Sequence, residues 1–412
     1  MNNESLSATN RCVMCGLCLP HCPTYLKTRN EADSPRGRIS LIRALSSDQL
    51  PASTPLVMHL EGCLTCRACE TVCPAKVPYG ELIDGAREIL NKGRSWKGHF
   101  ALILADVLVS GRRLRMAASW LLSLFHRSGL PHALISTRWP IPSRLRRTVT
   151  FLGPIPAQAI HYHQTPLTPN DDGVIALFTG CVAEILDRDT LSSSMHLLKY
   201  MGYEPWIPKH QTCCGAIHQH NGQPGKAMKY LRQNLTAFEH PKLEAVLSMA
   251  TGCGAQLSEY KQHLPLEQGK LFSNRHTDIC TFLANRIPSR PLKLNPLWTK
   301  VAIHTPCSQR YILKNQAAPF EILSLIPEID LVTLPNNNYC CGAAGSYMLT
   351  QADMADALLE DKLVEIDSLK PSIIVTSNIG CRLHLQAGLR RKGLNIEVIH
   401  PVTLLARQIE DL

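Results

Sequence analysis

Hydrophobic residues follow different spacings in the two ends of the chain. Before residue 92 they recur every three or four positions, in the segment 39–45 after Ser34-Pro35 and again in 78–90. This spacing predicts amphipathic helices, and serine followed by proline is typical of a helix start. After residue 173 the apolar residues form short uninterrupted runs, such as 174–178 and 301–304, which predict buried strands. We therefore expect a helical N-terminal part and an α/β C-terminal part.

The C-terminal part repeats itself after 126 to 128 residues. Cys181 at the end of one apolar run is echoed by Cys307, and Cys253 is echoed by Cys381. Between them, Cys213-Cys214-Gly215 is echoed by Cys340-Cys341-Gly342. A period this long indicates two tandem globular domains rather than a solenoid. The expected fold is α+β and multidomain, with a helical domain at 1–92, a basic linker at 93–172, and two α/β domains at 173–298 and 299–412.

The linker holds two apolar stretches, 100–109 and 116–125, separated by Gly111-Arg112-Arg113-Leu114-Arg115. Both are too short to span a bilayer, which takes about 20 apolar residues. Tryptophans among arginines would suit helices lying on an anionic membrane surface. Two helices packed on the rest of the chain or on a partner subunit, with solvated arginines, explain the same pattern. Both interpretations stay open.

Charge and composition narrow the class of protein. The segment 92–147 holds eleven Lys and Arg residues against Asp106 alone, which accounts for the whole net charge of +10. The basic balance is therefore local and does not indicate a nucleic-acid-binding protein. The segment 1–10 is polar and has no secretory pattern, so we expect a cytoplasmic protein whose 17 cysteines serve metal or redox chemistry.

Eight of those cysteines form the same phrase twice, C-x2-C-x2-C-x3-C-P, at 12–23 and 63–74. In this phrase three closely spaced thiolates bind one iron–sulfur cluster and the fourth cysteine binds the other. Structural zinc instead takes ligands in two pairs, and disulfides need an oxidising compartment, so both alternatives fit less well. The sequence predicts two [4Fe–4S] clusters, the first held by Cys12, Cys15, Cys18 and Cys73, and the second by Cys63, Cys66, Cys69 and Cys22.

The repeated domains offer a second set of sulfur ligands. In each copy the first and last cysteines follow a predicted strand, at the sheet edge where open α/β folds bind ligands. The Cys-Cys-Gly element adds two more thiols, and its glycine permits close backbone approach. Each domain could hold a further cluster or a zinc ion, with iron–sulfur favoured, or merely reduced thiols. The candidate ligands are Cys181, Cys213, Cys214 and Cys253 in the first domain, and Cys307, Cys340, Cys341 and Cys381 in the second.

The remaining cysteine and the nearby histidines are more simply explained as structural. Cys280 aligns with Leu404 in the second copy, which favours a small core residue over a ligand. Five histidines near the motifs could carry protons for a quinone, but ordinary hydrogen-bonding roles are the better expectation. These are His218, His220, His304, His384 and His400.

Motifs for other cofactors are missing from the sequence. No G-x-G-x-x-G follows a predicted strand, and there is no P-loop, nucleophile elbow or H-E-x-x-H. The chain therefore offers no evident site for a flavin or nicotinamide, which would accept a hydride from an organic substrate. We expect another subunit to supply that chemistry.

Together, the two cysteine phrases, the Ser34-Pro35-Arg36-Gly37-Arg38 segment and the paired Cys-Cys-Gly domains resemble the iron–sulfur subunits of glycolate oxidase (glycolate dehydrogenase). The segments 376–381 and 400–402 add to the likeness. Related iron–sulfur subunits occur in lactate-utilisation systems, anaerobic glycerol-3-phosphate dehydrogenase and heterodisulfide reductase. Unlike the last, this chain has Ala250 and Asn378 where the C-x-x-C pattern places a cysteine. That loss argues against a disulfide-cleaving cluster.

The resemblance implies the electron-transfer component of a multi-subunit enzyme. FAD-binding subunits would oxidise glycolate, and also D-lactate, to the 2-oxo acid. This chain would pass the electrons to the membrane quinone from the cytoplasmic face of the inner membrane, as a peripheral protein. Alternatives are a lactate or glycerol-3-phosphate dehydrogenase subunit, a thiol–disulfide reductase acting at the Cys-Cys-Gly sites, or zinc-stabilised docking domains.

Overall fold

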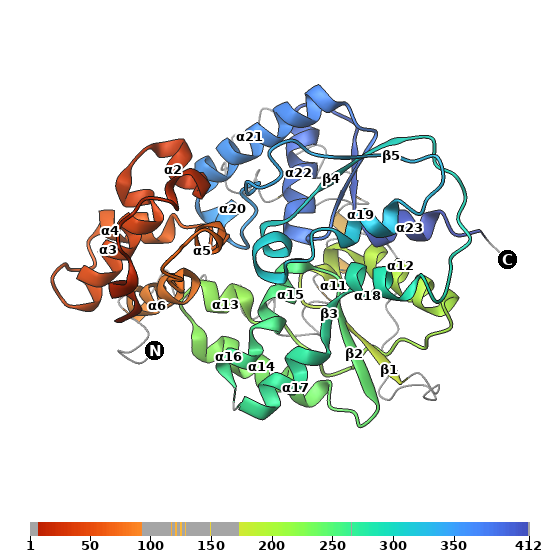
Figure 1. Ribbon diagram of the computed structural model, residues 1–412, viewed down its shortest axis with the longest axis horizontal. Coiled ribbons are helices and arrows are strands. Elements are labelled where there is room, and N and C mark those ends of the chain that lie inside the picture. Colours follow the sequence, from red (N-terminus) through yellow and green to blue (C-terminus); the bar gives the residue numbers. More distant parts are fainter. Residues whose placement is uncertain are drawn as a thin grey trace.

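The computed structural model describes residues 7–92, 173–264 and 266–410, together with seven single positions between 117 and 149. The basic linker 93–172 and its two predicted helices lie outside the described residues apart from those positions. Figure 1 shows a helical module at one side of the molecule, packed against two α/β units that lie side by side. Within the described ranges, no helix is both long and apolar enough to cross a membrane.

The N-terminal module is built from short helices around its cysteine loops. The two helices predicted from apolar spacing are confirmed as α3 (Pro35–Ser46) and α6 (Tyr79–Lys92). Their apolar faces meet in one core, where Ile42 contacts the side formed by Leu82 and Ile83. The other elements are η1 (Ala8–Arg11), η2 (Leu19–His21), α2 (Pro23–Thr28), η3 (Glu31–Asp33), α4 (Thr54–Glu61) and α5 (Ala68–Thr71).

The first turn of α3 is tightly fitted against η3. The hydroxyl of Ser34 accepts a hydrogen bond from the Gly37 N–H at 2.9 Å, which caps the helix as the sequence predicts. A Cβ atom on Gly37 would lie only 1.9 Å from the carbonyl oxygen of Glu31. Glycine at this position therefore allows the close approach that aligns both neighbouring arginines, Arg36 and Arg38, with the cysteine loops.

We expect Gly37→Ala to lower the stability of the full chain by about 3 kcal/mol, because overpacking of a fitted contact forces a backbone shift. Denaturant unfolding followed through visible cluster absorbance measures this change. Gly225→Ala is the matched control, since Gly225 also lies early in a helix and has no atom within 4 Å of the added Cβ. Equal midpoints for the two variants would contradict the steric account.

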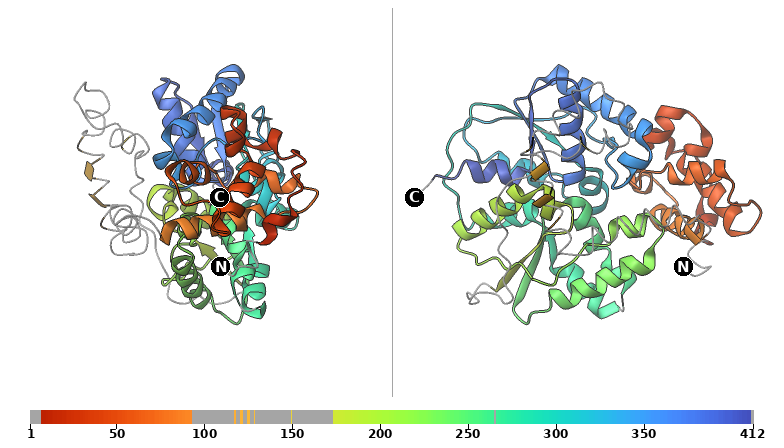
Figure 2. Two further views of the ribbon diagram at one scale, coloured as in Figure 1. Left: turned by 90° about the vertical axis from the view of Figure 1, so that its left-hand side faces the viewer. Right: turned by 180° about the vertical axis from the view of Figure 1, so that it is seen from behind.

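The first α/β unit contains a parallel sheet in the order β1-β2-β3, and Trp206 forms a parallel bridge to Ala176 beyond β1. Helices cover both faces of the sheet (Figure 2). The strands are β1 (Val174–Phe178), β2 (Leu243–Ser248) and β3 (His276–Asp278). The helices are α11 (Ala183–Leu186), α12 (Arg188–Tyr200), α13 (Ala216–His220), α14 (Pro224–Ala237), α15 (Thr251–Ser258), α16 (Tyr260–His263), α17 (Leu266–Arg275) and α18 (Ile279–Arg286).

The second unit repeats this topology with a parallel sheet in the order β5-β4-β6-β7. Its strands are β4 (Lys300–His304), β5 (Asp330–Thr333), β6 (Ile373–Thr376) and β7 (Glu397–Ile399). Its helical elements are the π-helical turn η4 (Ser308–Leu313), α19 (Ala318–Leu323), α20 (Tyr347–Thr350), α21 (Ala352–Leu369), α22 (Ile379–Arg391) and α23 (Pro401–Arg407).

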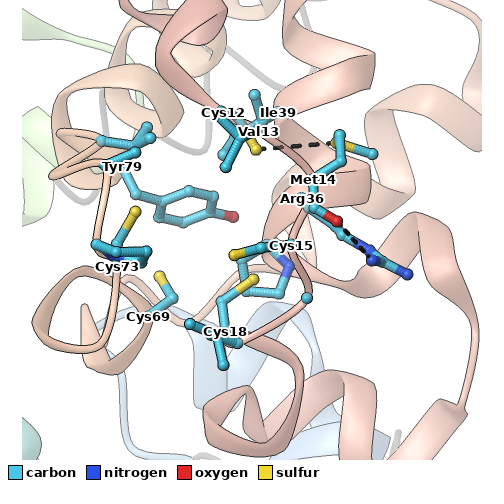
Figure 3. A pocket seen from close by; sticks show the side chains of 16 residues that line it. Cys12, Val13, Met14, Cys15, Cys18, Arg36, Ile39, Cys69, Cys73 and Tyr79 are labelled. Atoms are coloured by element: carbon cyan, nitrogen blue, oxygen red, sulfur yellow. Dashed lines mark hydrogen bonds between the residues drawn. The ribbon is translucent and has the colours of Figure 1, made fainter.

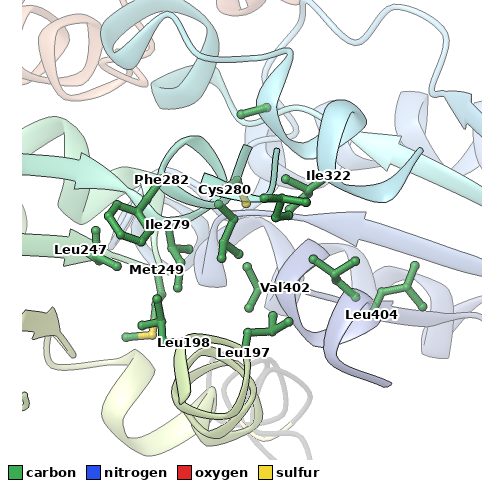
Figure 4. Packing of buried hydrophobic residues seen from close by; sticks show 14 of the residues in the cluster. Leu197, Leu198, Leu247, Met249, Ile279, Cys280, Phe282, Ile322, Val402 and Leu404 are labelled. Carbon is green, nitrogen blue, oxygen red and sulfur yellow. The ribbon is translucent and has the colours of Figure 1, made fainter. Parts of the chain in front are cut away.

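The two units share one apolar core. Leu197 and Leu198 of α12 pack with Val402 and Leu404 of α23, and α18 packs on α19 in the reciprocal arrangement (Figure 4). Cys280 lies fully buried in this core, among apolar side chains. The repeats therefore stabilise each other across a continuous interior.

The structure corrects the residue aligned with Cys280. Asp278 caps α18 by accepting hydrogen bonds from the N–H groups of Cys280 and Thr281, and His400 caps α23 by accepting one from Val402. Matching these two caps places Val402, not Leu404, opposite Cys280. The earlier alignment assumed a constant period, whereas the connections before the last strand differ in length. Val402 is also fully buried and apolar.

The helical module contacts both α/β units. Arg87 of α6 donates to the His220 carbonyl at 3.1 Å, and Asp84 contacts the His220 ring at 3.0 Å, which joins the module to the first unit. The Tyr347 hydroxyl donates to the Gly62 carbonyl at 3.0 Å, which joins it to the second. These contacts fix the cysteine loops relative to the repeats.

Candidate iron–sulfur sites

The two cysteine loops of the module have the same backbone conformation. Met14 and Gly16 in the first loop have positive φ angles of 56° and 84°. Thr65 and Arg67, each 51 residues later, have φ angles of 51° and 62°. Left-handed residues between the cysteines turn the chain so that sulfurs three positions apart face one side. The repeated phrase in the sequence therefore produces a repeated loop.

The first loop encloses a sulfur-lined hollow of about 460 Å³, partly open to solvent. Figure 3 shows the side chains of Cys12, Cys15, Cys18, Cys69 and Cys73 around it, with the Tyr79 ring beside them. The structure thus brings together the four cysteines predicted for the first cluster, although Cys73 is 55 residues from Cys18. The space among converging thiols fits an inorganic cluster.

A second hollow, of about 300 Å³, lies beside the first. Its lining contains the four cysteines predicted for the second cluster, which are Cys22, Cys63, Cys66 and Cys69. Cys69 and Tyr79 line both hollows, and the Tyr79 hydroxyl lies 3.5 Å from the Cys63 sulfur. The two predicted ligand sets are therefore adjacent.

Burial sets the protonation of these thiols in the absence of metal. Burial is the largest factor that raises the pKa of Cys18, to about 11, and it raises the pKa of Cys66 and Cys69 well above the usual value. Because metal ligands must be thiolates, binding here would release protons and stabilise the anions directly. The pocket chemistry thus suits a strongly bound cation-rich group.

Arg38 supplies a positive charge that sequence reasoning did not assign to the site. Its side chain is only 1% exposed and donates to the His59 carbonyl at 2.7 Å and to the Thr24 hydroxyl at 3.0 Å. The guanidinium also lies 4.0 Å from the Cys22 sulfur and lines the second hollow. The signal in the sequence was an arginine directly before the apolar face of a predicted helix.

The cysteines of each repeat gather at the carboxyl edge of its sheet. Cys181 and Cys307 follow β1 and β4, while Cys253 and Cys381 are the third residues of α15 and α22. In both repeats an amide side chain fixes the first connection, because Gln211 accepts from the Thr179 N–H and Asn337 from the Thr305 N–H, each at 2.8 Å.

The Cys-Cys-Gly turn is also the same in both repeats. The N–H groups of Gly215 and Gly342 each donate to the first cysteine sulfur of their turn at 3.4 Å. Their φ angles are 93° and 91°, and a Cβ on Gly342 would lie 2.6 Å from the Ala355 carbonyl. Glycine is required both for this conformation and for packing against the following helix.

In the first repeat the four thiols contact one another in series. The Cys181 and Cys213 sulfurs lie 3.6 Å apart, Cys214 follows Cys213, and its thiol contacts that of Cys253. Buried Asn234 and Tyr260 hold the turn by donating to the carbonyls of Cys213 and Cys214, at 2.9 and 3.0 Å. The predicted set is thus brought together by a polar network within an apolar core.

The second repeat brings its four cysteines together in the same series, from Cys307 through Cys340 and Cys341 to Cys381. One residue is added that the sequence analysis did not count as a ligand. A ring nitrogen of His304 and the sulfurs of Cys341 and Cys381 lie within 4.8 Å of one another. Its signal was a polar residue at the end of a buried strand, two residues before Thr305-Pro306-Cys307 finishes.

The other candidate histidines have protein partners. His218 contacts the Gln223 amide at 3.1 Å, His220 contacts Asp84, and His384 contacts the Ala355 carbonyl at 3.2 Å. His400 caps α23. These contacts agree with the hydrogen-bonding roles expected for them.

The second repeat is the one whose cysteines pack directly against the module. Cys66 and Cys307 both contact an apolar cluster that contains Leu64, Cys340 and Tyr347. Burial and, next, the neighbouring Cys307 thiol raise the pKa of Cys66. The described apolar clusters that hold the cysteines of the first repeat contain only residues of the two repeats. The sulfur sites therefore form a continuous series from the module into the second repeat.

Comparison with known proteins agrees with this division of the chain. The model of the 4Fe-4S dicluster domain family matches residues 8–77. The model of the cysteine-rich domain family matches residues 175–258 and again 301–386. The N-terminal module is thus a dicluster ferredoxin domain, followed by two cysteine-rich domains.

Relatives with the same order of domains cover nearly the whole chain. The probable glycolate oxidase iron-sulfur subunit of Bacillus subtilis is 31% identical over 96% of this chain and 92% of its own length. The glycolate oxidase iron-sulfur subunit of Escherichia coli is 30% identical over 94% and 92%. Lactate utilization protein A of Halalkalibacterium halodurans is 25% identical over 57% of this chain and 97% of its own. This chain belongs to the family of glycolate oxidase iron–sulfur subunits.

Proposed function

We propose that this chain carries electrons in a glycolate dehydrogenase complex, from FAD-binding subunits that oxidise glycolate to glyoxylate, and also D-lactate, to the membrane quinone. The two relatives named for glycolate oxidase support this substrate class. The chain's own sequence supports the division of labour, since its motifs offer sulfur ligands and no evident flavin or nicotinamide site. We propose a location on the cytoplasmic face of the inner membrane, where the basic segment 92–147 would face anionic lipid.

The ligand assignment follows the two hollows. We assign one [4Fe–4S] cluster to Cys12, Cys15, Cys18 and Cys73, and the other to Cys63, Cys66, Cys69 and Cys22. When bound, such clusters accept and release single electrons at potentials that hydrogen bonds and burial tune. Arg38 and the N–H of Thr65, which donates to the Cys63 sulfur at 3.4 Å, would stabilise negative charge on the second ligand set.

The observation that carries the proposal is the continuity of the sulfur sites. Cys69 and Tyr79 belong to both hollows of the ferredoxin domain, and Cys66 lies against the Cys307 and Cys340 site. Such a series suits electron transfer through the protein rather than chemistry at one isolated centre. On this view the second cysteine-rich domain also holds iron and takes part in the transfer.

Anaerobic purification with iron and acid-labile sulfide analysis tests the cofactor content. Two clusters supply about eight irons per chain, and a filled second cysteine-rich domain raises the count above that number. A zinc-rich chain with about eight irons would instead support docking domains.

Mixing the purified chain with the FAD-binding subunits and glycolate tests the function. We expect glycolate to bleach the visible absorbance of the chain only when those subunits are present. Absorbance that stays constant while the flavins become reduced would overturn the proposed electron transfer. A parallel assay with glycerol 3-phosphate distinguishes the alternative substrate class.

A further inference from the structure

The two cysteine-rich domains differ at one position beside their sulfur sites. His304 ends β4, and the residue 126 positions earlier, which ends β1, is Phe178. Phe178 packs against the Phe238 ring at a centroid distance of 5.9 Å. The repeats share their strand order, amide contacts and Cys-Cys-Gly turn, so this difference stands out against an otherwise common framework.

His304 is placed as a metal ligand would be. One of its ring nitrogens and the sulfurs of Cys341 and Cys381 all lie within 4.8 Å of one another, and all three residues are buried. Ligand atoms around a single tetrahedral ion with bonds of about 2.0–2.3 Å are separated by distances below that limit. These three side chains therefore converge on a space that one metal ion can occupy.

The orientation of the ring is fixed from its other side. Nδ1 of His304 lies 3.0 Å from the Thr376 hydroxyl, at the end of the adjacent strand β6. Metal-binding histidines typically hold their second ring nitrogen in this way, which sets the tautomer and aims the other nitrogen at the metal. With Nδ1 engaged by Thr376, Nε2 is the nitrogen available for binding.

We propose that His304 binds iron directly, together with Cys341 and Cys381, so that the second cysteine-rich domain has a mixed nitrogen and sulfur donor set. The first cysteine-rich domain, with Phe178 in the equivalent position, offers sulfur alone. This inference rests on the proposed function in one respect, which is that the metal of the second domain is iron.

A histidine ligand would set the redox behaviour of this domain apart. Imidazole binds as a neutral ligand where a thiolate carries a negative charge, and histidine ligands raise the potentials of iron–sulfur centres. The second site would then attract electrons more strongly than an all-sulfur site. Because it lies against Cys66, it is placed to draw electrons out of the ferredoxin domain.

Pulsed EPR on the full chain, labelled with ¹⁵N-histidine and poised at a series of potentials, tests the proposal. We expect a ¹⁵N coupling of the size given by a directly bound imidazole. It should vanish in His304→Phe, which copies the first repeat, and in His304→Gln. Both variants should also lose iron relative to the native chain.

The matched control is His276→Phe. His276 is also a buried histidine that contacts a strand-end hydroxyl, at 2.9 Å from Ser248, which occupies the position equivalent to Thr376. This variant should keep both the coupling and the iron content. Visible absorbance from the ferredoxin clusters shows in every sample that the chain has folded.

Absence of the ¹⁵N coupling from the native chain, or its persistence in His304→Phe, would overturn the proposal. In either case glycolate could still bleach the ferredoxin clusters through the FAD-binding subunits. Failure of the histidine ligand is therefore distinguishable from failure of the proposed electron transfer.

Discussion

Cys63→Ser is expected to lower glycolate-dependent quinone reduction by more than about 100-fold, since even outer-shell partners of a metal typically contribute about 10–100-fold. Cys63 lines the second hollow, and its sulfur accepts from the Thr65 N–H and lies near the Tyr79 hydroxyl. Serine would remove one thiolate from a set of four. Reduction of the flavins by glycolate should remain, because it takes place on other subunits. Parallel assays of flavin reduction and quinone reduction in the assembled complex measure the two steps.

The matched control for this experiment is Cys280→Ala. Cys280 is as fully buried as any cysteine of the chain, but it lies in the shared apolar core. It should retain native turnover, with at most a modest loss of stability. Quinone reduction that survives Cys63→Ser would show that electrons bypass the ferredoxin domain.

Arg38→Met is expected to have the largest effect on stability and potential. The change removes a fully buried charge that contacts Asp33 at 3.5 Å and lies near the Cys22 sulfur. Breaking a buried ion pair by removing one partner typically costs about 3–5 kcal/mol. The midpoint potential of the neighbouring cluster should also fall, because the reduced form carries more negative charge and loses a nearby cation. Denaturant unfolding and an EPR-monitored redox titration measure the two effects.

Arg43→Met provides the comparison on the same helix. Arg43 is exposed and makes one hydrogen bond, to the Thr9 carbonyl at 2.9 Å, so about 1 kcal/mol or less should be lost. Arg38→Lys should recover the potential more fully than the stability, because lysine restores the charge without the planar set of donors. A cluster potential that is unchanged in Arg38→Met would exclude the electrostatic role.

Much of the architecture could be predicted from spacing alone. The helices α3 and α6 follow from residues that recur every three or four positions, and the strands β1 and β4 from uninterrupted apolar runs. The cysteine phrases indicated which thiols converge because ligand spacing constrains a loop strongly. Repetition then divided the chain, since a matched offset identifies equivalent residues without any knowledge of the fold.

Contacts between distant segments could not be predicted in this way. Arg38 reads as one basic residue among several, and only packing of α3 against the loops buries it beside Cys22. The placement of Cys66 against Cys307 depends on how the ferredoxin domain docks, which no local pattern records. His304 was one of several histidines near the motifs, and its distinction is purely spatial. Alignment by a constant offset also failed where connections differ in length, as for Cys280.

The common interior of the two repeats resembles the interface of a twofold dimer contained within a single polypeptide. In a true homodimer symmetry places the same residue at both equivalent positions, so a substitution in one site always appears in the other. Joining the copies in tandem removes that restriction, and Phe178 and His304 can differ while the surrounding packing is kept. Covalent linkage thus gives this molecule two related sites with independent chemistry, a freedom that an assembly of identical chains does not have.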